Sequence, residues 1–343
     1  MKTLFLVPHL KISGGMRIIL TYADLLSRRG NDVSVVIEQR NTFRRIVSNI
    51  LRKKPNWFPA LHAKILRVRS LEEEFLHSAD IIVAGNYDIA LRVGQFSEKA
   101  GAPFYFIQHD EGMYHGGRSL VERAIALHSK KLVVSTWLQE LLRDKYGQPS
   151  RLLFNPTDRI LFHPLPKEPH AEVRVLLLDH TYEWKGTKEG IEVVKELKKK
   201  YPNIRLLGFG ARRKNAGTDF DEYYYNLPQE KLAWLYSRAD IFLCPSWDEG
   251  FGLPSVEAMQ CKTAVVTYDN GGSRDFAFDG KTALVAERRN MAQLKEKLEA
   301  LVKNSQLRDT IAKQGYEFVQ TMPTQDEQTA RFEEIFQEAL LKS

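Results

Sequence analysis

The chain has 343 residues, of which 43% are hydrophobic and 27% are charged, which excludes a disordered protein and predicts two folded domains of ordinary size. No apolar run approaches the roughly 20 residues that a membrane-spanning helix needs. The net charge is +7, but residues 39–70 hold nine Lys or Arg and no acidic residue, so the rest of the chain carries −2. The basic charge therefore belongs to one local segment.

The first half of the chain alternates short apolar runs with helical patterns. Its first run, Leu4–Val7, is ended by Pro8 too early for a secretory signal, and it predicts a buried strand. Apolar residues then recur at helical spacing across 16–29 before the next apolar run. This order predicts a parallel sheet with helices on both faces. The predicted strands are Leu4–Val7, Val33–Ile37, Ile81–Val83, Phe104–Ile107, Leu132–Val134 and Leu152–Phe154.

A proline-rich stretch separates the two halves. It predicts a linker at 165–172, between an N-terminal domain, 1–164, and a C-terminal domain, 173–325. The rhythm then restarts, and the chain closes with an amphipathic helix at 326–341. The predicted elements of the second half are strands at 173–178, 204–207, 241–244, 264–267 and 283–286, and helices at 188–200, 229–237, 254–260 and 291–303.

The chain has only two cysteines, Cys244 and Cys261. Both lie in apolar stretches without metal-ligand spacing, so buried packing explains them better than a metal site. A protein without a disulfide framework fits a reduced compartment, and we expect a cytoplasmic protein.

Two glutamates flank a Gly-Phe-Gly-Leu-Pro turn. Pro254 suits the first turn of a helix because its missing N–H is not needed there, so the strand 241–244 leads through this turn into a helix. Such loops border the ligand crevice of parallel sheets, and amides at a helix N-terminus bind phosphate. Carboxylates accept hydrogen bonds from sugar hydroxyls, so Glu249 and Glu257 suit a hexose and a ribose on either side of a diphosphate. Taken singly, Glu257 could merely favour the helix dipole and Glu249 be solvated.

This motif and its neighbours resemble a known family, the retaining family 4 glycosyltransferases of the GT-B fold, also called glycosyl transferases group 1. Its nucleotide-sugar site contains two glutamates separated by seven residues, here Glu249-GFGLPSV-Glu257. The resemblance implies an α/β fold with two doubly wound, Rossmann-like domains facing across a cleft, and a C-terminal helix, 326–341, that packs back on the N-terminal domain. Further matching segments, in the family's order, are SGGMR (13–17), QHD (108–110), FNPTDRILFHP (154–164), EWKG (183–186) and NGGSRDFAFDGKTALV (270–285).

The resemblance also implies roles for single residues. Glu257 would bind the ribose hydroxyls, and Glu249 would contact the donor sugar near the reaction centre. Lys185 would neutralise the diphosphate leaving group, on which charge develops as the bond breaks. His109 would reach the donor sugar from the N-terminal domain. The remaining donor contacts implied are made by backbone groups of Gly14, Gly15, Gly250, Phe251, Gly252 and Leu253.

The sequence departs from the family at His180. The family usually has an arginine there, five residues before its basic-loop lysine, whereas histidine is not reliably charged at pH 7. His180 therefore offers the donor a single hydrogen bond. Either Lys185 acts with another cation, such as Arg17, Arg212 or Arg213, or the diphosphate is bound differently.

The reaction implied by the resemblance is transfer of a hexose-type sugar from a nucleotide diphosphate sugar to an acceptor hydroxyl, with the anomeric configuration retained. No metal ion or other cofactor is expected, because lysine and helix dipoles carry the positive charge. Asp219 and Asp221 have the spacing of metal-binding carboxylates in another glycosyltransferase fold, but such triplets are common by chance.

Three alternatives stay open. A nucleotide-sugar epimerase of the same fold would share the donor and transfer nothing to an acceptor. A nucleic-acid-binding protein would use the cations of 39–70, although no recognised nucleic-acid module accompanies them. A nicotinamide-dependent dehydrogenase would use Gly14 and Gly15 with Glu38, but the sequence lacks its G-x-G-x-x-G pattern.

The basic segment 39–70 suggests where the acceptor lies. Ile46 and Ile50 recur at helical spacing among cations, and Trp57 adds an aromatic ring. This pattern suits either an anionic membrane surface or an anionic glycan, and it is also typical of a solvated basic face. We expect a lipid-linked or anionic cell-envelope acceptor, with peripheral contact of the protein to the inner membrane face.

Overall fold

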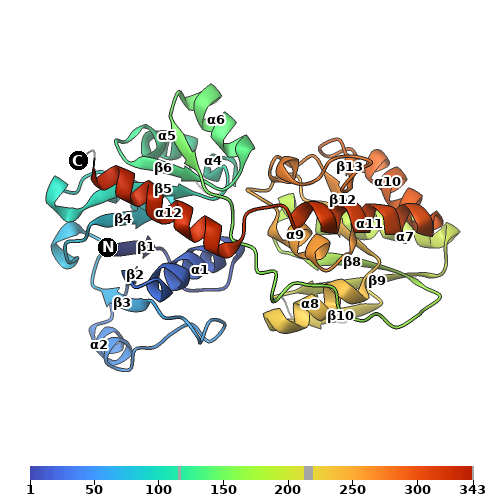
Figure 1. Cartoon of the computed structure of the whole chain (residues 1–343), viewed down its shortest axis with the longest axis horizontal. Coiled ribbons are helices and arrows are strands. Elements are labelled where there is room, and N and C mark those ends of the chain that lie inside the picture. The colour runs from blue at the N-terminus through green and yellow to red at the C-terminus, as the bar shows by residue number, and fades with distance from the viewer. Residues whose placement is uncertain (115–116, 212–218, 342–343) are drawn as a thin grey trace. The chain divides into compact units, whose positions relative to one another are not determined.

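The computed structural model describes residues 1–114, 117–211 and 219–341, and the chain divides into two compact units (Figure 1). Unit 1 comprises Met1–Pro156 and Pro323–Ser343, and unit 2 comprises Thr157–Met322. Each unit is built on one parallel sheet with helices on both faces, so the predicted α/β class is confirmed. None of the helices within the described ranges has the length and apolar content that crossing a bilayer requires.

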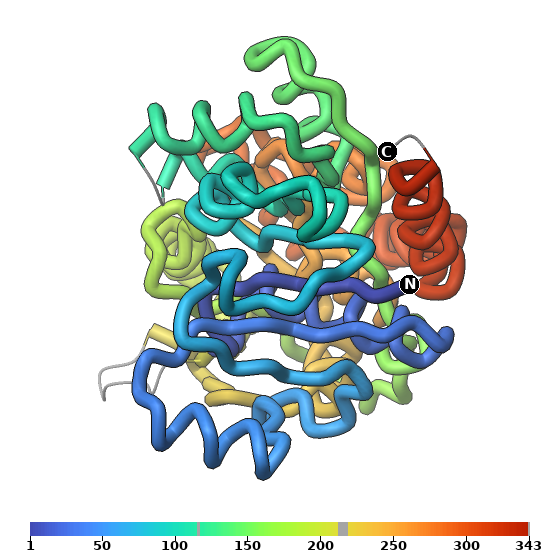
Figure 2. The backbone as a smooth tube through the Cα atoms, turned by 90° about the vertical axis from the view of Figure 1, so that its left-hand side faces the viewer, coloured from blue at the N-terminus to red at the C-terminus, as the bar shows by residue number. Residues whose placement is uncertain are grey.

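Unit 1 contains a seven-stranded sheet in the order β3-β2-β1-β4-β5-β6-β7, whose strands lie side by side in Figure 2. The first two strands run parallel in register, with Lys2 opposite Asp32. The strands are β1 (Lys2–Val7), β2 (Asp32–Glu38), β3 (Lys64–Val68), β4 (Ile81–Ala84), β5 (Ala102–Ile107), β6 (Lys130–Val133) and β7 (Ser150–Leu152). The helices are α1 (Gly14–Arg28), α2 (Thr42–Ile50), α3 (Tyr87–Val93), α4 (Glu111–Tyr114), α5 (Arg118–Ala126), α6 (Thr136–Tyr146) and α12 (Gln325–Leu340), with 3-10 turns η1 (Glu73–Phe75) and η2 (Glu98–Ala100).

The C-terminal helix α12 belongs to unit 1 (Figure 1). It begins with a capping box, in which the Thr324 side chain and Glu327 satisfy each other's backbone amides. Its buried Phe332 packs edge-on against Phe5 of β1, with ring centroids 6.0 Å apart. Phe336 packs in the same way against a phenylalanine of β5. The aromatic stripe of α12 thus completes the core of unit 1, although the rest of this unit ends at Pro156.

Unit 2 contains a six-stranded sheet in the order β10-β9-β8-β11-β12-β13, and its core consists of aliphatic side chains from the central strands and the covering helices. The strands are β8 (Val173–Asp179), β9 (Ile204–Gly210), β10 (Glu222–Tyr225), β11 (Ile241–Cys244), β12 (Ala264–Tyr268) and β13 (Leu284–Ala286). The helices are α7 (Thr187–Lys200), α8 (Gln229–Arg238), α9 (Leu253–Gln260), α10 (Met291–Lys303) and α11 (Ser305–Val319), with 3-10 turns η3 (Glu183–Lys185) and η4 (Gly272–Asp275).

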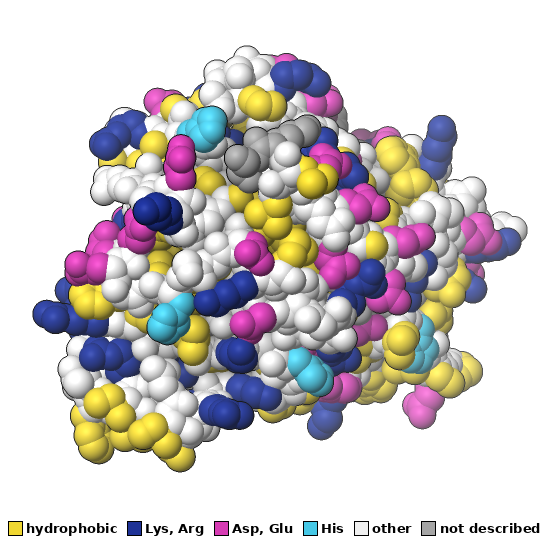
Figure 3. Space-filling model, turned by 60° about the vertical axis from the view of Figure 1, so that its left-hand side comes forward, with side chains coloured by type: hydrophobic (Ala, Val, Ile, Leu, Met, Phe, Trp, Pro, Cys, Tyr) yellow, Lys and Arg dark blue, Asp and Glu magenta, His cyan; other side chains and the backbone are white. Residues whose placement is uncertain are grey.

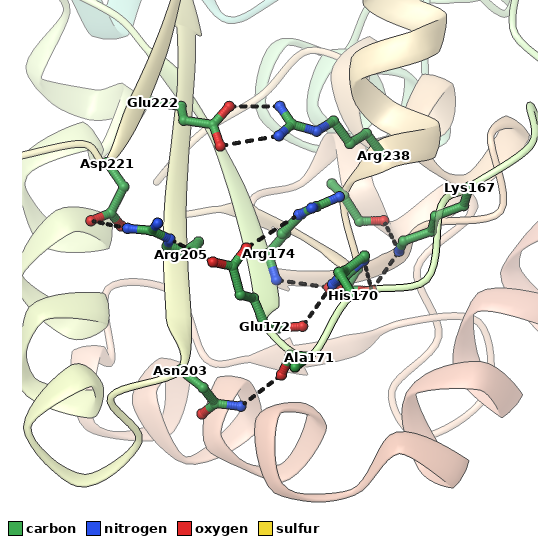
Figure 4. Close-up of polar contacts among 12 residues, drawn as sticks. Lys167, His170, Ala171, Glu172, Arg174, Asn203, Arg205, Asp221, Glu222 and Arg238 are labelled. Atoms are coloured by element: carbon green, nitrogen blue, oxygen red, sulfur yellow. Dashed lines mark hydrogen bonds and ion pairs between the residues drawn. The ribbon is translucent and has the colours of Figure 1, made fainter.

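The proline-rich stretch behaves differently from the predicted linker, because unit 2 already begins at Thr157. Leu165 N donates to the Ser237 hydroxyl over 3.1 Å, and Lys167 pairs with Asp240, whose other oxygen accepts from Arg174 N at 2.7 Å. Figure 4 shows these contacts continuing through His170 and Glu172 into a network of ion pairs on β8 and β9. Prolines keep this stretch out of the sheet, but its polar groups still bind it to unit 2.

Both sheets reverse their strand order once. In unit 1 the chain leaves β1 toward β2 and later returns to its other side at β4, and in unit 2 the same reversal separates β8 from β11. Ligand crevices of doubly wound sheets lie outside the carboxyl ends of the strands at such reversals. Each unit therefore has one natural position for a ligand.

Candidate functional site

The loops after β8 and β11 touch each other at Gly186 in unit 2. Gly186 has φ +64°, and a Cβ atom there would lie 2.0 Å from the Pro245 carbonyl oxygen. Only glycine fits, because any side chain would push the two loops apart. A backbone hydrogen bond from Trp247 N to Trp184 O, 2.7 Å long, fastens the loops on the other side of this contact.

This loop contact brings Lys185 to Glu249. The Lys185 Nζ lies 2.6 Å from Glu249 Oε1, and the two side chains are only 21% and 11% exposed. Lys185 ends the 3-10 turn η3, whereas Glu249 lies in the β11–α9 loop. The pair places one cation and one carboxylate at the carboxyl edge of the unit 2 sheet.

The backbone around Glu249 is clamped to the next loop of the sheet. Glu249 N donates to Asn270 O at 2.9 Å, and Gly272 N donates to Glu249 O at 3.2 Å. A Cβ atom at Gly272 would lie 2.6 Å from Phe251 N, so the two loops are in direct backbone contact. The position of Glu249 is therefore set by hydrogen bonds on both sides of its peptide.

The glycine turn leads directly into α9. Gly252 has φ +99° and is the N-cap of this helix, whose first turn receives no hydrogen bond from a capping side chain. Phe251 and Leu253 are 2% and 8% exposed, so their side chains pack inside unit 2 and only their backbone can meet a ligand. Amides at a helix N-terminus carry partial positive charge and suit an anion such as phosphate.

Glu257 lies one turn further along α9 and is 4% exposed. Its Oε2 accepts a hydrogen bond from the hydroxyl of Tyr236, 3.1 Å away on α8. Tyr236 is itself buried, and this contact fixes the carboxylate in one orientation. A fixed, largely dehydrated carboxylate is suited to bind hydroxyl groups of a ligand.

The two cysteines lie close to these glutamates. Both are free and buried, as expected. Burial raises the pKa of Cys261 to about 12, with a smaller contribution from the charge of Glu257, and burial likewise raises the pKa of Cys244. Both thiols stay protonated at neutral pH, which makes neither a suitable nucleophile.

His180 follows β8 directly, and its ring carries structural contacts. Its Nδ1 accepts a hydrogen bond from Tyr182 N at 3.1 Å, so the proton of the neutral ring resides on Nε2. The ring also packs on Tyr182, with centroids 4.6 Å apart, and Tyr182 stacks on Trp184. The residue at the family's arginine position is thus a hydrogen-bond donor without the reach or fixed charge of an arginine.

In unit 1, the predicted residues lie at the equivalent edge of the sheet. Gly14 and Gly15 open α1, whose Ser13 N-cap accepts from Met16 N. A Cβ atom at Gly15 would lie 3.2 Å from the Gln108 side chain, so the glycine loop lies against the segment that carries His109 after β5. The three predicted residues of unit 1 are therefore gathered near one place.

Sequence reasoning missed Glu111 in the same segment. Its side chain is 5% exposed and accepts hydrogen bonds from Tyr105 Oη at 3.0 Å and from Tyr87 N at 2.9 Å. Burial raises the pKa of Glu111 to about 7. Its buried contacts tie the His109 segment to the start of α3. The only sequence signal for Glu111 was its position directly after His109 and Asp110.

Two arginines and two aspartates considered from the sequence are not among the site residues that the structure describes. Arg212 and Arg213 lie outside the described residues. Asp219 and Asp221 pair with Lys195 and Lys198, and no metal-binding cluster occurs within 1–114, 117–211 and 219–341. Tyr236 and Asn270, which hold the two glutamates, were not predicted, because their contacts depend on the folded sheet and not on spacing.

Residues 162–318, which make up most of unit 2, match the family model for glycosyl transferases group 1. This part of the chain is therefore similar to the group 1 glycosyltransferases. Two similar proteins come from bacteria. The capsular polysaccharide biosynthesis glycosyltransferase CapM of Staphylococcus aureus is 27% identical over 140 residues, 38% of this chain and 37% of CapM. An N,N'-diacetylbacillosaminyl-diphospho-undecaprenol alpha-1,3-N-acetylgalactosaminyltransferase of Campylobacter jejuni is 29% identical over 142 residues, 40% of this chain and 38% of the relative.

The matched stretches span 37% of CapM and 38% of the Campylobacter relative, so the chain aligns with less than two fifths of the length of either relative. The likeness to solved structures extends over both units. The structure of Anabaena Alr3699/HepE in complex with UDP and glucose aligns with a TM-score of 0.78, covering 98% of this chain and 100% of HepE at 15% identity. This likeness shows the GT-B-like fold, with one Rossmann-like sheet in each unit.

Proposed function

We propose that the protein is a retaining glycosyltransferase that moves a hexose-type sugar from a nucleotide diphosphate sugar to an acceptor hydroxyl. The observation that carries the proposal is the set of groups at the β8–β11 reversal of unit 2. Along the chain, Glu249 with its ion pair to Lys185 is followed by the N-terminal amides of α9 and then by the buried carboxylate of Glu257. This order matches the sugar, diphosphate and ribose of a donor.

Each group has a chemical reason for its part. The amides of Gly250–Leu253 and the Lys185 ammonium would bind the diphosphate, and Glu257 would accept hydrogen bonds from the ribose hydroxyls. Glu249 would bind the donor sugar once phosphate has drawn Lys185 away. The His180 Nε2–H would supply one further hydrogen bond to the donor. UDP and glucose in HepE support this kind of donor.

In the transfer, the bond from the anomeric carbon to the phosphate oxygen breaks, and the acceptor oxygen bonds to that carbon on the same face. The acceptor proton passes to the departing phosphate oxygen, so no general base from the protein is needed. Lys185 and the helix amides stabilise the negative charge that develops on the leaving group. Since they supply this charge, the proposed reaction needs no metal ion. Gly14, Gly15 and His109 of unit 1 would complete the donor contacts.

The acceptor we propose is a cell-envelope glycan or a glycolipid. The Staphylococcus and Campylobacter relatives support this class, since one acts in capsular polysaccharide synthesis and the other on a diphospho-undecaprenol substrate. We propose a cytoplasmic protein, consistent with its free, buried cysteines.

The test is incubation of the purified chain with a panel of nucleotide sugars and candidate acceptors, with and without a chelator. We expect release of nucleoside diphosphate that persists with the chelator, and a product that keeps the anomeric configuration. Activity that is lost with the chelator and restored by manganese would disprove the metal-independent mechanism. Nucleotide binding with a changed sugar and no acceptor product would instead indicate a nucleotide-sugar epimerase, the second candidate of this fold.

A further inference from the structure

Helix α2 of unit 1 exposes its apolar face to solvent. It joins β2 to the edge strand β3, and Figure 2 shows it along that edge. A helix beside a sheet usually buries its apolar stripe, yet none of the nine residues of α2 is buried. Its inward contacts are polar instead: Asn49 and the Arg67 backbone exchange two hydrogen bonds, of 2.9 and 3.0 Å.

The outward face is a continuous apolar ridge. Phe43, Ile46 and Ile50 are spaced at i, i+3 and i+7, which puts them on one side of the helix. They are 76%, 51% and 73% exposed, and Leu51, directly after the helix, is 60% exposed. Figure 3 shows a cluster of hydrophobic side chains on this part of unit 1, with Lys and Arg side chains beside it.

Four cations accompany this ridge without acidic partners. Among the described residues, Arg44, Arg52, Lys53 and Lys54 form no ion pair, and the last three line a shallow open pocket at the end of α2. Elsewhere in the basic segment, Arg40 and Lys64 do pair with carboxylates. The exposed cations are thus concentrated where the exposed apolar side chains are.

The backbone that carries these cations is fixed. The Arg67 guanidinium donates to Lys53 O at 2.7 Å, and the Trp57 indole N–H donates to Leu10 O at 3.0 Å. Trp57 also packs edge-on against Phe58. The ridge and its cations therefore form a preformed surface, which we call the α2 face and define as Phe43, Arg44, Ile46, Ile50, Leu51, Arg52, Lys53 and Lys54.

We propose that the α2 face docks unit 1 on an anionic lipid bilayer. An interfacial helix buries its apolar face at the boundary between headgroups and acyl chains, while cations on its flanks attract anionic headgroups. Each cation near such a surface strengthens binding about fivefold. A soluble polyanion, whether a glycan or a nucleic acid, would use the cations but leave the apolar ridge in water. An anionic lipid surface uses both halves of the α2 face.

Docking does not depend on the transfer reaction. One consequence does rest on the proposed function. If the protein is a glycosyltransferase, its acceptor is carried by a lipid and the transfer takes place at the membrane surface. Nucleotide binding by unit 2 and lipid binding by the α2 face can then be lost separately.

The test is flotation of the full chain with vesicles of phosphatidylcholine alone or with about one third phosphatidylglycerol, at low and high salt. We expect binding to the anionic vesicles that weakens with salt. The substitution of Arg52, Lys53 and Lys54 by Gln should weaken it roughly a hundredfold, following the fivefold effect per cation. The pair Ile46→Ser and Ile50→Ser should abolish the binding that remains at high salt. Exposed side chains make these variants compatible with folding.

Control variants remove groups of the same kind elsewhere. Lys199→Gln, Lys262→Gln and Lys303→Gln together delete three exposed cations of unit 2, and Ile160→Ser deletes an isoleucine that is 90% exposed. Both controls should bind vesicles like the unchanged protein, and all variants should keep their nucleotide affinity. Equal binding to neutral vesicles, no binding, or α2-face variants that bind normally would each overturn the proposal. Binding to a soluble polyanion such as heparin without binding to vesicles would overturn it as well.

Discussion

Lys185 and Glu249, 64 residues apart in the chain, hold each other in an ion pair with Lys185 Nζ 2.6 Å from Glu249 Oε1. A diphosphate bound at the N-terminus of α9 would compete with Glu249 for the lysine. The ion pair thus holds the cation on the residue that we assign to the donor sugar. Arrival of the donor would transfer Lys185 to phosphate and release the carboxylate.

The first prediction separates the two members of this pair. Lys185→Ala should weaken the binding of a bare nucleoside diphosphate by about 1.5–3 kcal/mol, the usual value of a hydrogen bond to a charged group, and it should also lower turnover. Glu249→Gln should lower turnover while nucleotide affinity is kept or increased, because Lys185 is no longer held. Titration calorimetry and steady-state kinetics measure the two effects. Equal losses of nucleotide affinity in both variants would contradict the proposed transfer of Lys185 from Glu249 to the diphosphate.

The second prediction concerns Glu257. Glu257→Ala should weaken nucleotide binding by roughly 1.5–3 kcal/mol, since charge-assisted hydrogen bonds to hydroxyl groups are lost. Tyr236→Phe is the matched control, because it keeps the carboxylate and removes only the hydroxyl that orients it. Calorimetry should give it a smaller loss. Unchanged affinity in Glu257→Ala would defeat the ribose assignment.

The third prediction uses His180→Arg, which restores the residue that the family usually has. A guanidinium adds a fixed charge and several donors near the proposed diphosphate site. Nucleotide affinity should be kept or increased, and the gain should shrink with salt as expected for a partly exposed charge. A large loss of affinity with an unchanged melting temperature would mean that the donor needs the single hydrogen bond of the histidine ring and that a guanidinium cannot replace it.

The fourth prediction tests the loop contact at Gly186. Gly186→Ala should lower both thermal stability and nucleotide affinity, because its Cβ would overlap the Pro245 carbonyl oxygen. Gly147→Ala is the control, since Gly147 has φ +61° and nothing within 4 Å of a Cβ atom. It should show only the cost of left-handed backbone, about 1–2 kcal/mol, with nucleotide affinity unchanged. Similar affinities in the two variants would show that the loop contact does not shape the site.

The sequence was most informative where a local pattern determines local structure. The helices at 14–28, 253–260 and 325–340 lie within two residues of the predictions, because their caps and apolar spacing are encoded nearby. The edge strand β3 was missed, since charged residues interrupt KILRV and leave only two consecutive apolar residues, too few for the continuous apolar run of a central parallel strand. The helix at 305–319 was missed as well.

The site shows the same division. The turn at 250–254 could be predicted because glycine and proline limit its backbone directly. The contacts Tyr236–Glu257 and Lys185–Glu249 could not, because each joins elements whose proximity depends on the order of strands in the sheet. Strand order is a property of the whole unit, so spacing along the chain does not contain it.

The last prediction is a pH dependence that arises from Glu111. Burial raises the pKa of this carboxyl from 4.5 to about 7, although Tyr87 N and Tyr105 Oη donate to it and oppose the shift. Between these two values the folded chain binds more protons than the unfolded chain, so the free energy of unfolding of unit 1 should fall as the pH rises through this window. The contribution lost is on the order of 3 kcal/mol.

Glu111→Gln mimics the protonated acid, since its amide can accept from Tyr87 N and donate to the Tyr105 hydroxyl. Denaturant unfolding from pH 4.5 to 8 should show a gain in stability for this variant that grows with pH, whereas the exposed Glu122→Gln should follow the unchanged protein. A constant difference between Glu111→Gln and the unchanged protein across this range would mean that Glu111 titrates alike in the folded and unfolded chain.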